Sequence, residues 1–220
     1  MKVLGLDSSG LVAGVALIQD DVLIAEYTTD YKKTHSQTLL PMLDELRRMV
    51  DLDLKSIDLI AVAAGPGSFT GLRIGSATAK GLGLALDIPL AAVPTVDALA
   101  YNLYGCEQLI CPMMDARRGQ VYTGIYTFVN GEMQVIQEQC AISVEELAGR
   151  LKEECEKCGK KVVLLGDGVP VYREKVQEIL QGQCEFAPAS CNRQRAACVA
   201  VLGQSLAAAG KTVSSDDFAP

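Results

Sequence analysis

Histidine and aromatic residues are scarce in this sequence. Its 220 residues include a single histidine, His35, no tryptophan, and only 5% aromatic side chains. Two histidines at helical spacing, a common basis of catalytic zinc sites, are therefore impossible, and a Ser-His-Asp triad would have to use His35. Nothing around Ser36 or Ser68 indicates an activated serine. The sequence thus argues against a zinc hydrolase and a serine hydrolase, and we expect His35 to cap or line the start of a helix.

Positive charge is also in short supply. Lysine and arginine number 20 against 27 aspartates and glutamates, which gives a formal net charge of −7. A surface that binds the phosphates of a nucleic acid tightly normally carries a basic excess. We therefore expect any contact with RNA to be indirect, through a partner.

Long apolar runs and export signals are missing as well. Lys80, Asp87 and Pro89 interrupt the most apolar region, so no stretch reaches the roughly 18 residues that a membrane helix needs. Met1 leads straight into an apolar segment, without the basic region of a signal peptide. With 49% hydrophobic residues, the chain is expected to be a globular cytoplasmic protein that does not bind membranes.

Cysteine, by contrast, is frequent. Eight cysteines in a chain of this size indicate free, buried thiols in a reducing compartment. Cys155 and Cys158 form a C-x-x-C pair, a candidate metal or redox site. They also lie on the apolar stripe of a helix predicted over 144–158, which Ser143 would cap and Gly159 would end. No second closely spaced pair completes a zinc site, so we predict no metal.

The chain divides into two halves with a similar order of elements. The first half reads as a three-stranded meander followed by alternating helices and strands, predicted at Val3–Asp7, Gly14–Ile18, Val22–Thr28, 38–50, Leu59–Ala64, 70–86, Leu90–Val93 and 95–104. Pro41 would then lie in the first turn of the helix over 38–50, where proline is tolerated.

The pattern restarts about 108 residues after its beginning. An apolar run again ends in aspartate, and the later elements are predicted at Cys111–Asp115, Val121–Phe128, 144–158, Val162–Leu165 and 193–209. We therefore expect an α/β fold of two subdomains, 1–108 and 109–220. The second should be reduced, and the last helix could pack back on the first.

The aspartates that end the opening strand of each half are candidates for a nucleotide site. Asp7 and Asp115 could supply one carboxylate each to a metal ion or a phosphate group. Alternatively, both are turn residues that bond to nearby backbone N–H groups, as aspartate often does. Their spacing leaves both interpretations open.

Residues 65–75, GPGSFTGLRIG, form the most distinctive stretch of the chain. A glycine-rich turn between a strand and a helix often binds phosphate. The lysine of a P-loop, the last glycine of the dinucleotide fingerprint and both flanking glycines of a nucleophile elbow are missing. The stretch therefore matches none of these standard catalytic or phosphate-binding loops. Its conformationally constrained and polar positions are Gly65, Gly67, Ser68, Thr70 and Arg73.

This stretch closely resembles the signature of the TsaB family, also called YeaZ. Other similar segments include Asp7-Ser8-Ser9, Asp115-Ala116-Arg117-Arg118 and Gly166-Asp167-Gly168. The two halves also resemble the actin, sugar-kinase and Hsp70 superfamily, whose paired aspartate turns flank a nucleotide and its metal. The resemblance implies vestigial nucleotide-site positions at Asp7, Asp115, Gly166 and Gly168, the last two in a turn near the adenosine.

The family resemblance also implies a function. TsaB is a bacterial subunit of the machinery that puts threonylcarbamoyl on the adenosine beside the tRNA anticodon. The chain would be a non-catalytic scaffold beside a TsaD-like transferase, which keeps the metal and nucleotide site, and a TsaE-like ATPase. It would need no cofactor of its own, with ATP and Mg²⁺ acting through partners and tRNA contacted indirectly. The alternative is a small-molecule kinase of the same superfamily, with Asp7 and Asp115 flanking Mg-ATP.

Small residues form a row on the helix predicted over 70–86. Glycine inside a helix costs roughly 1 kcal/mol relative to alanine, so a close backbone approach would explain several together. The row could pack internally or face a partner. We expect a partner surface on the first two helices, used for a homodimer when alone and for a TsaD-like subunit in the complex. Its predicted residues are Leu39, Leu43, Leu46, Gly71, Leu72, Gly75, Ala79, Leu82 and Gly83.

Overall fold

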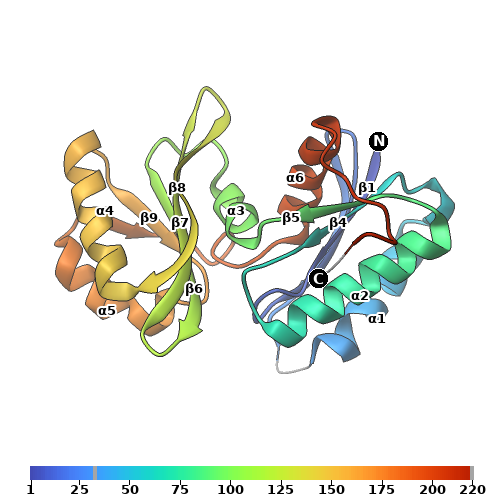
Figure 1. Cartoon of the computed structure of the whole chain (residues 1–220), viewed down its shortest axis with the longest axis horizontal. Coiled ribbons are helices and arrows are strands. Elements are labelled where there is room, and N and C mark those ends of the chain that lie inside the picture. Colours follow the sequence, from blue (N-terminus) through green and yellow to red (C-terminus); the bar gives the residue numbers. More distant parts are fainter. Residues whose placement is uncertain (32–33, 219–220) are drawn as a thin grey trace. The chain divides into compact units, whose positions relative to one another are not determined.

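The last helix of the chain packs on the first sheet, and this return sets the boundaries of two units. A computed structural model describes residues 1–31 and 34–218 (Figure 1). The first unit joins Met1–Ala98 to Gln194–Pro220, and the second is Leu99–Arg193. The units differ from the expected halves, 1–108 and 109–220, because the last helix packs back on the first unit, as the sequence had allowed.

A five-stranded mixed sheet forms the centre of the first unit. Its strands are β1 (Lys2–Asp7), β2 (Ala13–Gln19), β3 (Val22–Thr29), β4 (Leu59–Ala63) and β5 (Leu90–Val93). Their order is β3-β2-β1-β4-β5, with β1 antiparallel to β2 and parallel to β4. The apolar residues of β1 and β4 are buried on both faces, as expected for central strands.

Helices cover both faces of this sheet. The amphipathic helix α1 (His35–Met49) and the helix α2 (Phe69–Leu86) share one hydrophobic core with one face, and α6 (Ala196–Ala208) packs on the other (Figure 1). Apolar residues alternate along each strand and so serve both cores: Leu4 and Leu6 face α1 and α2, whereas Val3 faces α6.

Helix α1 begins earlier than expected. It starts at His35, so Pro41 lies inside the helix and not in its first turn. Proline removes one backbone hydrogen bond there. Pro41 and Gln37 are both exposed, so water can reach the carbonyl that proline leaves without a donor.

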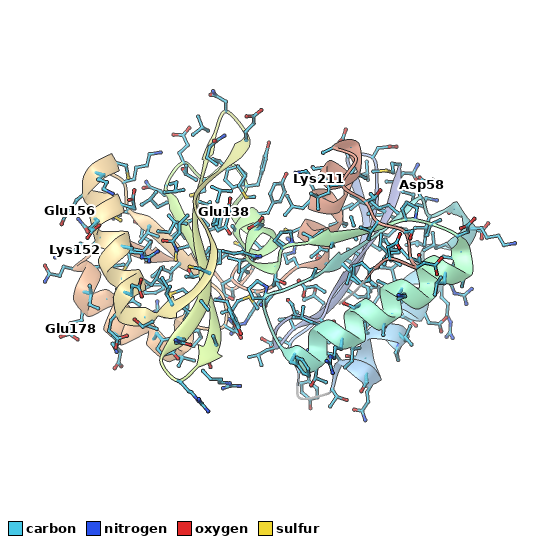
Figure 2. All side chains as sticks on the ribbon, in the orientation of Figure 1. Asp58, Glu138, Lys152, Glu156, Glu178 and Lys211 are labelled. Atoms are coloured by element: carbon cyan, nitrogen blue, oxygen red, sulfur yellow. The ribbon has the colours of Figure 1, made fainter. Side chains whose placement is uncertain are left out.

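The second unit contains a sheet of the same design. Its strands are β6 (Leu109–Arg117), β7 (Gln120–Val129), β8 (Glu132–Ser143), β9 (Val162–Leu165) and β10 (Cys184–Phe186). Their order is β10-β9-β6-β7-β8, with β6 antiparallel to β7 and parallel to β9. Helices α4 (Val144–Cys158) and α5 (Val169–Leu180) share one core with this sheet. The outer sides of these helices carry charged side chains such as Lys152, Glu156 and Glu178 (Figure 2).

The predicted repeat is confirmed. The runs Val3–Asp7 and Cys111–Asp115 lie in β1 and β6, which occupy the same central position in two separate sheets. The sequence did not predict β8, α5 and β10. Strand β8 lies at the edge of its sheet with little apolar alternation, and β10 has only three residues.

Short helical segments complete the chain. A 3-10 turn, η1 (Leu54–Ser56), precedes β4, and α3 (Thr95–Ala100) continues into a second 3-10 turn, η2 (Tyr101–Leu103). Within residues 1–31 and 34–218, none of the helices has both the length and the apolar character needed to cross a membrane.

Candidate functional site

Asp7 ends β1, and its carboxylate is used inside the first unit. Its Oδ1 accepts hydrogen bonds from the backbone N–H of Ser9 (2.9 Å) and from the Ser9 hydroxyl (2.6 Å). Asp7 is 1% exposed, and its Oδ2 has no hydrogen-bond partner among the described residues. Burial raises the pKa of Asp7 above its ordinary value, against the opposing effects of Ser9 and His35. The carboxylate therefore holds the turn after β1.

The glycine-rich loop lies directly on this turn. The backbone N–H of Ser68 donates to the Ser9 carbonyl (2.6 Å), and the Ser8 hydroxyl donates to the Gly71 carbonyl (2.8 Å). A Cβ atom at Gly67 would lie 2.3 Å from the Ser9 oxygen, and one at Gly71 would lie 2.0 Å from the Ser8 oxygen. Close approach within the unit thus accounts for both glycines.

The remaining polar contacts of the loop also hold it in place. Gly65 has a φ of 105°, its N–H donates to Thr95 Oγ1 (3.1 Å), and its carbonyl accepts from the Thr95 N–H (2.8 Å). The Ser68 side chain accepts from the Gly71 N–H (3.3 Å) and so caps α2. The signature loop is therefore a structural connection between β4 and α2.

Two further polar side chains lie beside the Asp7 turn. His35 Nε2 is 2.8 Å from the Gly10 carbonyl oxygen, so this histidine lines the start of α1 as predicted. Gln194 is 1% exposed, and a Cβ atom at Gly10 would lie 2.5 Å from its Nε2. Neither amide atom of Gln194 has a hydrogen-bond partner among the described residues. The region is polar, buried and closely packed.

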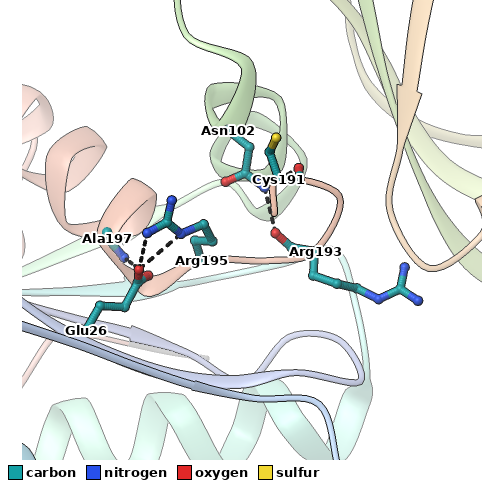
Figure 3. Close-up of polar contacts among 6 residues, drawn as sticks. All are labelled: Glu26, Asn102, Cys191, Arg193, Arg195 and Ala197. Atoms are coloured by element: carbon teal, nitrogen blue, oxygen red, sulfur yellow. Dashed lines mark hydrogen bonds and ion pairs between the residues drawn. The ribbon is translucent and has the colours of Figure 1, made fainter. Parts of the chain in front are cut away.

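A capping carboxylate connects β3 with the start of α6. Glu26 Oε1 accepts from the backbone N–H of Ala197 (3.0 Å), and Glu26 Oε2 accepts from Arg195 Nε (3.0 Å; Figure 3). The Glu26 side chain is only 10% exposed. A carboxylate at a helix N-terminus binds the unpaired N–H groups and the positive end of the helix dipole. Glu26 thereby fixes α6 on the first sheet.

Asp115 lies near the end of β6, the equivalent strand of the second unit, where the register with β7 is irregular, and it has a similar role. Its Oδ1 accepts from the backbone N–H of Arg117 (2.9 Å) and from the Tyr172 hydroxyl (3.0 Å). Its Oδ2 is 3.2 Å from the Arg117 guanidinium. Both strand-end aspartates thus bond to the N–H group two residues on, the turn arrangement that their spacing had left open.

Gly166 and Gly168 allow a second tight approach in this unit. The Gly168 N–H donates to the Met113 carbonyl (2.8 Å), and a Cβ atom at Gly166 would lie 2.3 Å from the same oxygen. Burial raises the pKa of Asp167 between them, and Arg193 opposes that rise. Asn102 Nδ2 donates to the carbonyls of Cys191 and Arg193, which lie in the loop after β10 (Figure 3).

The cysteines do not converge on a metal site. Among the described residues, no group of three or more histidine, cysteine, aspartate or glutamate side chains could hold a metal ion. Ser143 and Gly159 cap α4 as predicted, with Cys155 buried and Cys158 exposed. Burial raises the pKa of the Cys155 thiol to about 11 and that of Cys198 to about 12. These thiols are therefore protonated near neutral pH.

The expected partner residues lie largely inside the first unit. Leu39, Leu43 and Leu46 are at most 5% exposed and belong to the core beneath α1. Gly71 and Gly75 approach Ser8, Gly83 approaches Ser215, and Ala79 is fully buried, so the row of small residues faces inward. Leu72 and Leu82 are half-buried. The row is explained by internal packing, the other of the two possibilities that the spacing had left open.

A different stripe of α2 faces outward. Phe69 is 69% exposed and Leu84 is 52% exposed, with Thr70, Arg73 and Ala77 also on the exposed side. The Arg73 guanidinium lies 3.8 Å from the centre of the Phe69 ring. Leu40 and Met49 are the large exposed apolar residues of α1, at 55% and 66%. The first two helices therefore do present an apolar surface, made of other residues than expected.

The fold places the protein in a broad class. The two sheets have the same strand order, and helices and strands alternate in the same order along each half of the chain. This arrangement defines an α/β protein of the actin, sugar-kinase and Hsp70 type. A solved structure of ROK hexokinase from Thermus thermophilus shows this fold, with a TM-score of 0.51, 14% identity, and coverage of 91% of this chain and 98% of the hexokinase.

More specific similarity identifies the family. The family model described as TsaD, tRNA N6-adenosine threonylcarbamoyltransferase, matches residues 23–219. The tRNA threonylcarbamoyladenosine biosynthesis protein TsaB of Bacillus subtilis is 35% identical over 95% of this chain and 90% of its own length. YeaZ from Pseudomonas aeruginosa has a TM-score of 0.80 at 26% identity, covering 98% of this chain and 96% of YeaZ. The chain belongs to the TsaB (YeaZ) family of tRNA threonylcarbamoyladenosine biosynthesis proteins.

Several residues that shape these sites were not singled out in the sequence. Tyr172 lies on α5, a helix that the sequence did not predict. Glu26 lies 169 residues before its partner Arg195, and no local pattern joins them. Phe69 and Leu84 could have been found, because positions 69, 73, 77 and 84 fall on one side of a helix with 3.6 residues per turn.

Proposed function

We propose that this chain is a non-catalytic subunit in tRNA threonylcarbamoyladenosine biosynthesis. Membership of the TsaB family supports the pathway. The observation that carries the non-catalytic role is the internal use of both strand-end carboxylates. Asp7 is buried and bonded to Ser9, and Asp115 is held by Arg117 and Tyr172. A carboxylate that orders a Mg²⁺-nucleotide needs oxygen atoms that face the ligand. The one Asp7 oxygen without a hydrogen-bond partner among the described residues, Oδ2, is buried.

The partner in this proposal is a TsaD-like transferase subunit that holds the nucleotide and metal. The exposed stripe of α2, with Phe69 and Leu84, and the exposed Leu40 of α1 supply the surface. A contiguous exposed apolar patch generally marks a contact with another protein, and in this proposal these side chains form one. The isolated chain would pair with itself through the same stripe. A TsaE-like ATPase would complete the cytoplasmic assembly, so that ATP and Mg²⁺ act through partners.

Calorimetry with Mg-ATP tests the non-catalytic role of the isolated chain. We expect no heat of binding at micromolar to millimolar nucleotide. Binding in the micromolar range that Asp7→Ala abolishes would contradict the proposal and support a small-molecule kinase. Reconstitution with TsaD-like and TsaE-like proteins provides the positive test, because modification of tRNA should depend on this chain.

A pair of charge substitutions tests the surface. Phe69→Glu with Leu84→Glu should abolish the dimer in sedimentation and prevent capture of the TsaD-like subunit, because two charges would be buried without partners. Both side chains are exposed in the single chain, so the double variant should remain folded. Val171→Glu is the matched control, since Val171 is 58% exposed on α5 of the second unit. A double variant that still dimerises and still captures the partner would place the interface elsewhere.

A further inference from the structure

We propose that the turn between β6 and β7 is an RNA contact, in which Arg117 and Arg118 bind phosphate groups of tRNA. The inference rests on the proposed function, because it concerns the chain assembled with its partners. It also differs from the expectation that tRNA is contacted only indirectly. The turn lies entirely within the second unit.

The backbone of this turn is unusual for its residues. Arg117, Arg118 and Gly119 have φ angles of 70°, 53° and 76°, all in the left-handed region. The loop of two residues follows the pair Arg117↔Gln120, and such hairpin turns strongly favour Asn-Gly. Arg117, which precedes this loop, and Arg118, which lies in it, both carry a conformational cost that asparagine or glycine would reduce. A binding role for the arginine side chains would explain why that cost is tolerated.

The backbone is held firmly while the guanidinium groups are accessible. The Arg117 N–H donates to Asp115, and the Gly119 carbonyl accepts from the Val144 N–H (3.0 Å). The Arg117 side chain is 80% exposed. Arg118 is exposed, and its guanidinium has no hydrogen bond or ion pair with residues 1–31 or 34–218. The turn thus presents two cations on a fixed support.

Nearby carboxylates do not prevent phosphate binding. The ion pair between Arg117 and Asp115 is solvent-exposed on the arginine side, and such pairs are weak. If Arg117 turns to a phosphate, Asp115 keeps the Tyr172 hydroxyl and the Arg117 N–H as donors. Glu145, which follows Val144, is already paired with Lys175.

The chemistry of the turn favours RNA over a protein partner. A guanidinium group binds two phosphate oxygens through parallel N–H groups. Residues 117–120 are Arg-Arg-Gly-Gln, and they include no large apolar or aromatic side chain of the kind that anchors protein interfaces. The net charge of −7 also means that a local pair of arginines, and not the whole surface, would provide the contact.

Binding of a labelled, unmodified tRNA transcript to the reconstituted complex tests the inference. Arg117→Gln with Arg118→Asn should weaken binding several-fold at moderate salt. The slope of log affinity against log salt should fall by about 1 to 2, since each lost phosphate contact releases about 0.7 to 0.9 fewer counterions. Arg118→Asn should also raise the thermal midpoint, because asparagine tolerates the left-handed conformation. Arg150→Gln with Lys157→Gln, which removes two exposed positive charges from α4, is the charge-matched control.

The possible results separate the two proposals. A wild-type complex that fails to assemble or to modify tRNA contradicts the proposed function itself. If that complex is active and the double variant keeps the affinity and the salt slope, the RNA contact is wrong. Unchanged tRNA affinity with weaker assembly would identify an acidic protein surface as the partner and would also overturn it.

Discussion

Single aspartates hold the corresponding turns of the two units. Asp7 bonds to the N–H of Ser9, just after β1, and Asp115 bonds to the N–H of Arg117, the last residue of β6, so each carboxylate fixes the chain direction at the end of a central strand. The environments differ, because Asp7 is buried whereas Asp115 is held beside an exposed arginine. Only Asp7 therefore combines complete burial with an oxygen that lacks a hydrogen-bond partner among the described residues.

Asp7→Asn should stabilise the protein at pH 7. The raised pKa of Asp7 means that the folded state binds its proton more tightly than the unfolded state. Protonated Asp7 therefore favours folding below the ordinary aspartate pKa, and this contribution is lost as the pH rises through the folded pKa. Asparagine keeps an acceptor for Ser9 without the charge, so we expect a gain on the order of 1 kcal/mol. Urea unfolding should show the gain at pH 7 and a smaller one at acidic pH; a less stable variant at pH 7 would contradict the argument.

At the scale of elements, helix α2 has one face that packs inside the first unit and one face that is exposed. Its small residues allow the helix to lie against the Asp7 turn, the sheet and the segment containing Ser215. Its outward stripe carries Phe69 and Leu84. Substitution of the inward glycines, for example Gly75→Leu or Gly83→Leu, should therefore damage folding itself. Any loss of the dimer in such a variant would be a consequence of that damage.

Two glycine-to-alanine changes in α2 should have opposite effects. A Cβ atom at Gly71 would meet the Ser8 carbonyl oxygen at 2.0 Å, whereas one at Gly81 has no neighbour within 4 Å. Gly71→Ala should lower the free energy of unfolding by about 1–3 kcal/mol through overpacking. Gly81→Ala should raise it by about 1 kcal/mol through helix propensity. Denaturant unfolding of both variants checks this, and equal effects would mean that the row of small residues does not pack inward.

Glu26 should be essential for the docking of α6. Glu26→Ala removes the acceptor for the Ala197 N–H and the partner of Arg195, so we expect a loss of about 2 kcal/mol. Glu26→Gln keeps an acceptor for the N–H group and should lose less. Thermal unfolding of the two variants provides the comparison. A Glu26→Ala variant as stable as the unchanged protein would show that α6 is held by its apolar contacts alone.

At the scale of the whole molecule, the first unit is built from both ends of the chain. Val199 and Ala200 of α6 cover Val3, Leu59 and other residues on one face of the first sheet. The second unit, by contrast, is one continuous segment, Leu99–Arg193. The folding of the first unit therefore depends on residues synthesised last.

Fragments should reveal this dependence. A fragment of residues 1–108 lacks α6 and exposes one apolar face of its sheet, so we expect it to aggregate or to give poorly dispersed NMR spectra. Residues 99–193 should fold alone, because both α4 and α5 are present. A peptide of residues 194–220 should restore dispersed spectra to the first fragment. A well-folded 1–108 fragment without the peptide would contradict the role of α6.

The sequence alone determined the local structure and the repeat. Continuous apolar runs predicted β1, β4 and β9, because strands that are buried on both faces need little else. The caps Ser143 and Gly159 predicted both ends of α4, and the string at residues 65–75 predicted the family. Strand β8 was missed, because an edge strand has no strict alternation. Helix α5 was missed although Pro170 in its first turn is a helix-start signal.

Tertiary structure decided what each surface contacts. Glycine at 71, 75 and 83 showed that something approaches α2 closely, but the identity of the neighbour depends on the path of distant segments. The apolar face of α6 likewise left open whether it would pack back on the first unit, and the structure shows that it covers β1. Periodicity records which side of an element is apolar. Chain topology decides what covers that side, because the covering residues come from far away in the sequence.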